Sequence, residues 1–577
     1  MPLENIYKKV RNTIHKLDQR IEWAKYSYLD QPLKNVEYFE GGLYDAIYDA
    51  SCKWSHRVAL EYFETQITYK EMIKKINRVA AALKAIGAKK GENITICMPN
   101  TPEEIYMFYA VNEIGAVANM VHPLSSEKEI EEYLNQAHSR IMLCIDISYP
   151  KVENIIKNTE VEQLIVVSPS RSMDLVVRAV YKLTKGRKNH IKKSQHLLTW
   201  DKFLSKANHF IGNPHTRVNS EDAAVIMYSG GTTGKPKGVI LSNLNFNAQA
   251  IGAKYLVPEL IKSKHSFLTF LPNFHAFGLG VCIHLPLYFG CRVVLIPQFT
   301  AKKLKKYLKK YKINILVGVP SVFDYFTKLK FGPRDLRHLK GVVSGGDVVS
   351  MSTKERVNDF LEAHGSKAIL ENGYGLTEAS GGFIFSTRSV ARDPDGIGFP
   401  IPDNEVIIVD PKTGKKAQTG QDGEIVVRGL SVMKGYLGKP AETKKAFIKV
   451  GTKKYLRTGD IGYQDEDGLF HFRSRLKRMI ISNGYNIYPA NIEDVTLKCK
   501  LVKSCAVVGR EDKIRGQKVV VFVVASPNAH ERAIRRELGP IYRQYLAKYE
   551  IPREIRFLDD LPRTKLAKVD FKALEQL

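Results

Sequence analysis

The chain is poor in the features that mark disulfide-stapled, zinc-binding and membrane-spanning proteins. Its seven cysteines are an odd number among 577 residues, and no two of them form a CxxC pair. Neither a disulfide framework nor a zinc cage is therefore expected, and a reducing compartment is favoured. The longest uncharged run, from Phe267 to Cys291, contains Pro272 and Pro286. These prolines predict a buried strand, a turn and a buried helix rather than a membrane span.

The N-terminal segment lacks the unbroken apolar core of a secretory signal. Its apolar residues Ile6, Val10, Ile14, Leu17 and Ile21 are separated by charged residues at helical spacing. We therefore expect a cytoplasmic protein.

Acidic residues are in deficit, with 60 Asp and Glu against 88 Lys and Arg, which gives a net charge of +28. In the cluster 302–312, KKLKKYLKKYK, the apolar residues share one helical stripe and the lysines the other. This pattern predicts a core helix with a solvated basic face. The alternative is that the lysines contact the inner face of an anionic membrane. A second cluster, 178–193, shows no clear periodicity and predicts an exposed loop. Neither cluster carries an RNA-binding aromatic signature, so no nucleic-acid partner is expected.

Helical patterns alternate with short apolar runs between about residues 43 and 427, which predicts a large α/β region with mainly parallel strands. A β-rich subdomain is expected at about 400–473. A basic segment at 474–478 is the expected hinge, and residues 479–577 have the size of a small, mobile α+β domain. The large N-terminal domain would then span 1–473. The expected strands of the large region are 93–97, 141–145, 164–167, 292–296, 314–319 and 341–343.

A loop rich in glycine and hydroxyl groups, YSGGTTGKPKGV, follows a predicted strand at 223–227. Glycines let the backbone approach a polyphosphate, while hydroxyls and lysines add donors and charge, so the loop suits ATP. It is not a Walker A loop, because Ser229 stands where the first Gly belongs and Pro236 follows the lysine. The candidate ATP-binding residues of the loop are Ser229, Gly230, Gly231, Thr232, Thr233, Gly234, Lys235 and Lys237.

This loop resembles the phosphate-binding signature of the adenylate-forming superfamily, which contains acyl-CoA synthetases, adenylation domains of peptide synthetases and beetle luciferases. Its Gly-Gly form is most similar to the long-chain fatty acid–CoA ligases. Further motifs follow in the family's order, up to residue 568. The resemblance implies a carboxylic acid, ATP and coenzyme A as substrates, with Mg²⁺ as the metal.

The segment NGYGLTE, residues 372–378, supplies an aromatic ring, a hydroxyl and a carboxylate. Tyr374 can stack on a purine, Thr377 can bond a phosphate, and Glu378 can hold Mg²⁺ against phosphate oxygens. The resemblance implies these same roles and places Gly375 in the nucleotide site.

The remaining nucleotide contacts are implied by the resemblance. Gly345 and Gly346 match the glycine turn beside adenine, although Asp347 stands where a small residue is more usual. Asp460, in the segment RTGD, matches the aspartate that binds the ribose hydroxyls. Arg475 matches an arginine that also binds ribose.

Three positions near the end of the chain match the moving parts of the family. Lys477 matches the pivot of a domain rotation. Gly484 matches the glycine that leaves room for the pantetheine arm of CoA. Lys568, in LPRTKLAKV, matches the catalytic lysine that bridges the substrate carboxylate and the α-phosphate, where negative charge gathers. Ala567 stands where the family usually has Gly, and Lys565 where Pro is common; we expect a slower first step, not a lost one.

His275, in LPNFHAFG, matches the family residue at the carboxylate end of the acyl pocket. Its neighbours are apolar and partly small, which suits an elongated hydrocarbon tunnel. The sequence therefore predicts an acid–thiol ligase that forms an acyl-AMP, releases pyrophosphate and passes the acyl group to CoA. The alternatives are a ligase for an aryl acid or a carrier-protein acceptor, and a catalytically lapsed nucleotide-binding or membrane-associated protein. Chain length and oligomeric state stay open.

Overall fold

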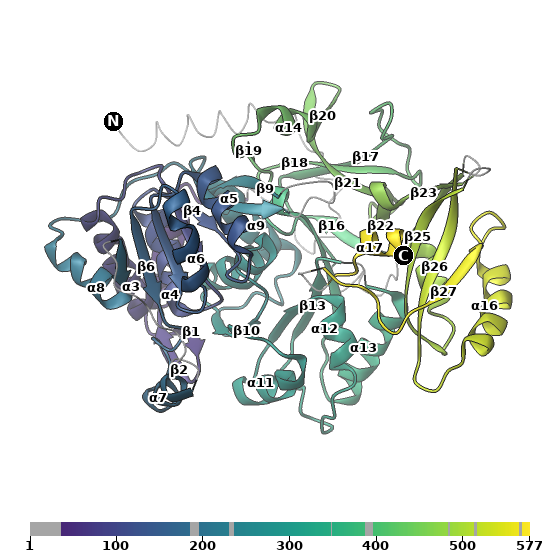
Figure 1. Ribbon diagram of the computed structural model, residues 1–577, viewed down its shortest axis with the longest axis horizontal. Coiled ribbons are helices and arrows are strands. Elements are labelled where there is room, and N and C mark those ends of the chain that lie inside the picture. The colour runs from purple at the N-terminus through teal and green to yellow at the C-terminus, as the bar shows by residue number, and fades with distance from the viewer. Residues whose placement is uncertain are drawn as a thin grey trace.

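The computed structural model describes residues 36–184, 196–229, 236–347, 349–386, 396–482, 485–512, 516–564 and 568–577. Figure 1 shows a large body, coloured purple to green, and a smaller yellow body formed by the C-terminal part of the chain. Within the described ranges, no helix has both the length and the apolar character needed to cross a bilayer. The predicted helical stripe between residues 6 and 21 lies outside these ranges.

One sheet of the large body has eight strands and is mainly parallel. Adjacent strands from β8 to β7 run parallel, whereas β9 and β19 are added in antiparallel fashion. The inner strands β3, β4 and β5 are almost entirely buried, as expected when helices cover both faces of a parallel sheet. In spatial order the strands are β19 (Gly435–Tyr436), β9 (Lys237–Ser242), β8 (Ala223–Ser229), β4 (Val117–Met120), β3 (Asn93–Cys97), β5 (Ile141–Ile145), β6 (Gln163–Val167) and β7 (Leu197–Thr199).

A second sheet has fourteen strands and changes character along its width. The strands from β14 to β1 are parallel, whereas the remaining strands pair antiparallel. In spatial order they are β17 (Asn404–Val409), β18 (Gly423–Gly429), β21 (Lys453–Gln464), β22 (Phe470–Arg475), β16 (Gly396–Pro400), β15 (Ile384–Phe385), β14 (Leu370–Tyr374), β13 (Gly341–Gly345), β12 (Ile315–Gly318), β10 (Ser266–Thr269), β11 (Arg292–Leu295), β1 (Val58–Tyr62) and β2 (Thr65–Thr68), with β20 (Phe447–Val450) beside β21.

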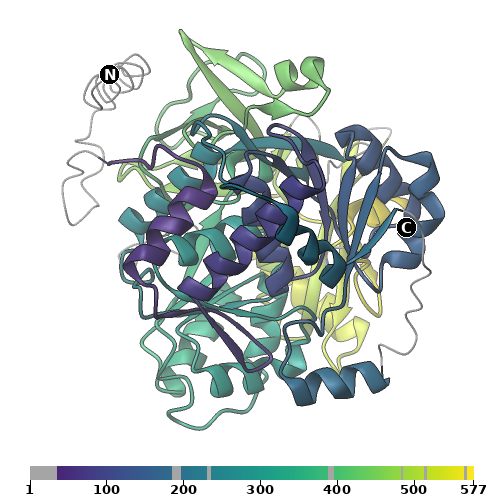
Figure 2. The ribbon, with the colours of Figure 1, turned by 90° about the vertical axis from the view of Figure 1, so that its left-hand side faces the viewer.

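Helices pack on and between these sheets, and Figure 2 looks onto the purple N-terminal ones. Helix α4 begins after Thr101, whose hydroxyl accepts from the Glu104 backbone N–H, and all its residues are buried. The helices of the large body are α2 (Leu43–Lys53), α3 (Tyr69–Ala85), α4 (Pro102–Glu113), α5 (Glu127–Ala137), α6 (Tyr149–Ile155), α7 (Leu175–Thr184), α8 (Trp200–Lys206), α9 (Asn243–Leu256), α10 (Leu285–Tyr288), α11 (Leu304–Tyr311), α12 (Pro320–Phe326), α13 (Met351–Ala363) and α14 (Pro440–Lys445). Short helical segments include η5 (Phe277–His284), a π-helix, and the 3₁₀ segments η6 (Ala301–Lys303), η7 (Thr377–Ala379) and η8 (Leu476–Arg478).

The C-terminal body has its own five-stranded sheet and its own apolar clusters, as a separate small domain requires. The segment η8 joins it to β22 of the large body. Its elements are β23 (Ile480–Ser482), β24 (Tyr485–Ile487), β25 (Val502–Asp512), β26 (Gly516–Ala525), β27 (Glu554–Phe557), α15 (Pro489–Thr496), α16 (Glu531–Tyr545) and α17 (Phe571–Gln576).

The predicted fold class is confirmed, since a large α/β body precedes a small C-terminal one. Two expectations need correction or refinement. The sequence predicts an exposed loop at 178–193, but residues 178–184 belong to helix α7, and 185–193 lie outside the described residues. The β-rich region continues the large sheet, because β16 pairs with β22. The boundaries at 473 and 478, and rotation about that hinge, stay predictions.

Candidate active site

The predicted nucleotide residues converge where parallel strands of the large sheet end. Strands β13 and β14 are parallel neighbours, with Gly345 beside Gly373, so the turn at 345–346 and the 374–378 segment leave the sheet side by side. Ligands of α/β proteins commonly bind at the carboxyl ends of such strands. On the antiparallel side, β21 and β22 place Asp460 directly opposite Arg475.

Asp460 is the centre of a small polar cluster. Its Oδ1 lies 3.0 Å from Nε of Arg475, and its Oδ2 accepts a 2.7 Å hydrogen bond from the Tyr374 hydroxyl. Burial raises the pKa of Asp460 above its ordinary value, while Arg475 and the Tyr374 hydroxyl oppose the shift. Oδ1 is buried and receives no aligned hydrogen bond from any residue the structure describes. A carboxylate oxygen in this state fits a ligand hydroxyl, as ribose would supply.

Lys568 reaches this cluster from the C-terminal body. Its Nζ donates to the carbonyl oxygen of Gly346 over 2.6 Å. Gly346 has a φ of +81°, which glycine adopts without strain. Partial burial lowers the pKa of Lys568, and the neighbouring carboxylate of Asp347 opposes this shift. The two predicted ends of the site, at the glycine turn and at Lys568, are thus in contact.

Glu378 lies on η7, beside Thr377 and close to Gly375. It accepts a hydrogen bond from Tyr436, which belongs to none of the sequence motifs. The Tyr436 hydroxyl donates to Oε1 of Glu378 over 3.0 Å. Among the described residues, no group of three or more Asp, Glu, His or Cys could hold a metal ion. A single carboxylate nevertheless fits Mg²⁺, which usually takes one or two protein carboxylates and completes its shell with phosphates and water.

The phosphate loop is described only at its two ends. Ser229 and Lys237 are paired residues of the β8–β9 hairpin. The ammonium of Lys237 is 2.7 Å from a carboxylate oxygen of Glu442 and 4.8 Å from the centre of the Tyr436 ring. Residues 230–235 lie outside the described residues, as do Gly484 and Ala567. Their predicted roles are untested, and Lys477 can only be placed, on η8.

His275 lies on the loop between β10 and η5. Burial lowers the pKa of His275 to about 4, with smaller contributions from His122 and Lys568, so the ring is neutral at pH 7. Its Nε2 is buried without a hydrogen-bond partner in the part of the chain that the structure describes. The ring of His122 stacks on Phe274 at 4.2 Å, and its Nδ1 accepts from the Leu124 backbone N–H.

Buried polar side chains of α4 and the preceding loop hold the His275 segment. Asn100 donates from Nδ2 to the Leu271 carbonyl, and Asn273 donates from Nδ2 to Glu104 over 2.7 Å. Glu104 is fully buried, and burial raises its pKa to about 8, although the Asn273 bond opposes the shift. At neutral pH the carboxyl group is therefore mostly protonated.

The segment after His275 leads into the apolar interior. The ring of Phe277 packs over Gly345, where a Cβ would lie 2.8 Å from the Phe277 Cζ. A small cavity lies between η5, α9 and the parallel strands, and its lining is mainly apolar but also includes Glu371, Asn372 and Ser386. Its lining includes Val257, Val281, Val317, Val343 and Phe385. A mainly apolar space between η5 and strand β13 can accept part of a hydrocarbon chain.

Four residues of the site escaped the motif reading. Tyr436 and Glu442 follow the β-rich strands far along the chain, and His122 and Glu104 precede the phosphate loop. Nothing in their local sequence separates them from ordinary core or turn residues. Only their long-range contacts with Glu378, Lys237 and the His275 loop assign them to the site.

Comparison with known proteins agrees with this geometry. A family model described as "AMP-binding enzyme" matches residues 48–437, and one described as "AMP-binding enzyme C-terminal domain" matches residues 491–568. A long-chain-fatty-acid–CoA ligase of Bacillus subtilis is 29% identical over 528 residues, which cover 90% of this chain and 92% of the relative. A probable 4-coumarate–CoA ligase of Dictyostelium discoideum is 28% identical over 510 residues, covering 87% and 88%.

Solved structures share the fold. ATP-bound MatB from Rhodopseudomonas palustris matches with a TM-score of 0.80 at 23% identity, over 93% of this chain and 99% of that one. A benzoate CoA ligase from Burkholderia xenovorans matches with a TM-score of 0.76 at 22% identity, over 92% and 99%. The resemblance to the adenylate-forming superfamily is thereby confirmed.

Proposed function

Since the chain belongs to the AMP-binding enzyme family, we propose that it activates a long-chain fatty acid with ATP and transfers the acyl group to coenzyme A. ATP, Mg²⁺ and CoA are the cofactors of this family's acid–CoA ligases. The main support for the proposal is the hydrogen bond from Lys568 to the carbonyl of Gly346. This bond lies next to the cluster of Asp460, Arg475 and Tyr374. A ribose-binding carboxylate and a mobile cation are the two elements that adenylate formation needs.

In the first step, the acid's carboxylate attacks the α-phosphorus of ATP, and pyrophosphate leaves. Lys568 holds the two anions together and stabilises the charge that gathers on the phosphorus. Asp460 and Arg475 bind the ribose, and Tyr374 stacks on the adenine. Glu378 would hold Mg²⁺ and Thr377 would bond a phosphate; the metal, when bound, would supply positive charge to the phosphate oxygens.

In the second step, the thiol of CoA attacks the acyl carbonyl, and AMP leaves. Lys568 has no part in this step, so the C-terminal body can turn about Lys477 and bring the loop with Gly484 to the site. The reaction needs no protein nucleophile. His275 stays neutral and lies beside the reacting carboxylate, where an imidazole can orient an oxygen without adding charge.

The long-chain assignment rests on two supports. Several curated relatives over most of the chain are long-chain-fatty-acid–CoA ligases, including those of Bacillus subtilis and Haemophilus influenzae. The cavity between η5 and α9 has a mainly apolar lining, which suits part of a hydrocarbon tail. Coumarate, benzoate and anthranilate ligases are also among the similar proteins, so an aryl acid is the second candidate.

The test is acid-dependent pyrophosphate release by the purified full chain with MgATP, with and without CoA. The acids are acetate, octanoate, palmitate, oleate, benzoate and coumarate. The proposal expects the highest kcat/KM with the long acids and formation of the matching acyl-CoA. Preference for benzoate or coumarate would move the assignment to an aryl acid, and adenylation without a CoA product would favour a carrier protein. If folded protein that binds ATP releases no pyrophosphate with any of the acids, the chain is a catalytically inactive nucleotide-binding protein.

A further inference from the structure

Helix α7 (Leu175–Thr184) presents its apolar side to solvent, contrary to the usual arrangement of a surface helix. The side chains of Leu175, Val176, Val180 and Leu183 are 78%, 71%, 55% and 67% exposed. At helical spacing these four residues fall on one side. The opposite side, which includes Val177 and Tyr181, is half-buried against the body.

The segment that precedes α7 is held to the body by polar contacts. Ser172 donates from Oγ to Glu103 over 2.6 Å, and Arg171 pairs with Asp201 over 2.6 Å. The Tyr62 hydroxyl of β1 donates to the Pro169 carbonyl. These contacts hold the segment that leads into α7 on the surface of the body.

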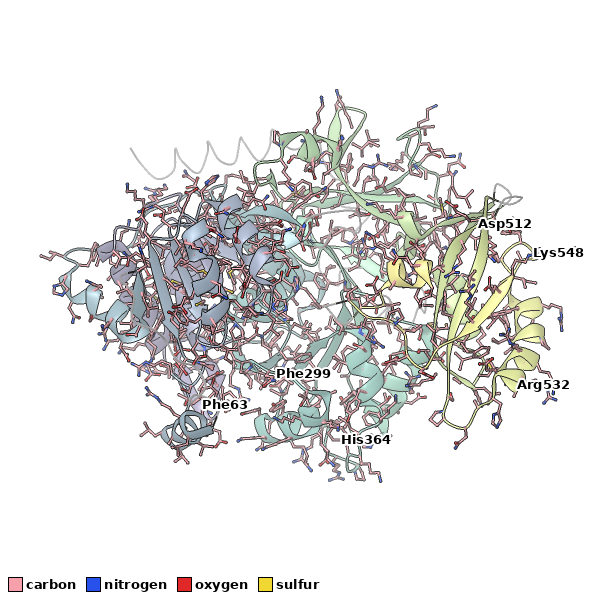
Figure 3. The ribbon with its side chains drawn as sticks, in the orientation of Figure 1. Phe63, Phe299, His364, Asp512, Arg532 and Lys548 are labelled. Carbon is pink, nitrogen blue, oxygen red and sulfur yellow. The ribbon has the colours of Figure 1, made fainter. Side chains whose placement is uncertain are left out.

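The β1–β2 hairpin lies beside α7 in both ribbon views. Phe63, at the tip of this hairpin, adds a partly exposed ring, and Figure 3 shows it on the same lower edge as α7. We call the exposed side chains of Phe63 and of the four α7 residues the apolar ridge. A group of exposed apolar side chains on neighbouring elements is typical of an interaction site, whereas single exposed apolar residues are ordinary.

The β1–β2 hairpin also contacts helix α11, which is rich in lysine. Glu64, next to Phe63, forms an ion pair with Lys310 of α11. Helix α11 buries Leu304, Leu308 and Tyr311 and turns its lysines outward, as its sequence pattern predicts. Lys302, Lys303 and Lys306 are exposed, and none of the three forms an ion pair within the described ranges. The helix that contacts the hairpin of Phe63 thus also carries exposed lysines whose charge no ion pair in the described ranges balances.

From this juxtaposition we infer that the apolar ridge and the lysines of η6 and α11 bind the surface of an anionic lipid bilayer. Apolar side chains that enter the acyl boundary, next to lysines that attract anionic headgroups, are the two parts of an interfacial membrane contact. A net charge of +28 adds a long-range attraction to the same surface. The inference does not depend on the acid that the enzyme activates.

The experiment is flotation of the full chain with vesicles at low salt. One set contains phosphatidylcholine alone, and the other contains equal amounts of phosphatidylcholine and phosphatidylglycerol. The wild type is expected to float with the anionic vesicles and to be released by salt. The apolar variant combines Leu175→Glu with Leu183→Glu, and the basic variant combines Lys302→Glu, Lys303→Glu and Lys306→Glu. Each should weaken binding by a factor of roughly ten or more.

Matched controls separate the surface from general effects of charge. Ile211→Glu changes an apolar side chain that is 96% exposed and lies outside the ridge. The triple variant Lys412→Glu, Lys415→Glu and Lys416→Glu makes the same charge change at exposed positions after β17. Both controls should bind vesicles as the wild type does. Thermal unfolding and acid-dependent pyrophosphate release in the absence of lipid should be unchanged in all four variants.

Three results would overturn the inference. The first is a wild type that does not float with anionic vesicles. The second is equal flotation of the wild type and the apolar variant. The third is an apolar variant that binds vesicles normally but changes from dimer to monomer in light scattering, because the ridge would then bind a second copy of the chain.

Discussion

Lys568 and Gly346, 222 residues apart, are joined by a hydrogen bond of 2.6 Å from the lysine ammonium to the glycine carbonyl oxygen. Gly346 belongs to the turn after β13 of the large body, and Lys568 belongs to the C-terminal body. The bond therefore fixes the arrangement in which the lysine enters the proposed adenylate site. In the proposed mechanism, that arrangement serves the first chemical step and not the second.

Replacing Lys568 by Ala should separate the two steps. Adenylate formation should slow by a factor of roughly 10²–10³, because one preorganised donor to the transition state is lost. Transfer from supplied acyl-AMP to CoA should stay close to the wild-type rate. Both rates can be measured on one preparation. Lys572→Ala, an exposed lysine on α17, is the matched control, and equal loss in both steps would contradict the assigned role.

Tyr374→Phe removes the hydroxyl that donates to Asp460. A hydrogen bond to a charged group contributes about 1.5 kcal/mol or more, so ATP affinity should fall by roughly tenfold. The pKa of Asp460 should rise further, so the loss should be largest at acidic pH. Tyr455→Phe on β21, whose hydroxyl interacts with Glu405, is the control. Titration calorimetry with ATP measures the effect, and unchanged affinity would remove Asp460 from the ribose site.

Glu104→Gln should change how stability depends on pH. The native pKa of Glu104 is about 8, against an ordinary value of 4.5, so the folded protein binds the extra proton between these values. Wild-type stability should then fall as pH rises from 4.5 to 8, by on the order of 4 kcal/mol from this group. The Gln variant lacks this loss and should be the more stable protein at pH 8.5, with the difference vanishing near pH 4.5.

Denaturant unfolding of both proteins across this pH range gives the difference directly. Glu113, whose pKa burial also raises to about 8, is present in both proteins and cancels. A constant difference between the two curves would show that Glu104 ionises normally.

Val281→Phe places a larger side chain in the cavity between η5 and α9. The expected result is a fall of roughly tenfold or more in kcat/KM for palmitate, with butyrate little affected, because only a long tail needs this space. Overpacking should cost about 1–3 kcal/mol of stability, which thermal unfolding would detect. Equal losses with both acids would place the acyl tail elsewhere.

The regular parts of the fold follow from local patterns. Strand β3, buried at four of five positions, and the apolar stripe of α11 are visible as sequence periodicity. The basic cluster 178–193 does not reveal helix α7, because the cluster begins past the start of the helix's apolar stripe. The link between β16 and β22 was not predictable either, since pairing between strands 70 residues apart depends on the completed fold.

Some residues of the candidate site could be predicted from sequence motifs, and others could not. Asp460 and Lys568 are ordinary residues in isolation, and only the ordered set of motifs assigned them roles. Their meeting with Arg475 and Gly346 agrees with that assignment. Tyr436 and His122 lie outside every motif, and their parts in the site come from tertiary contacts that the local sequence does not encode.

The central claim, an acyl-adenylate on the way to a thioester, is tested most directly by isotope transfer. Palmitate labelled with ¹⁸O at both carboxylate oxygens is converted with MgATP and CoA. The ¹⁸O content of each product is then measured by mass spectrometry. The account predicts one ¹⁸O in AMP for each palmitoyl-CoA formed, because the attacking carboxylate oxygen leaves with AMP. Thioester formation with unlabelled AMP, or with the label in inorganic phosphate, would contradict it.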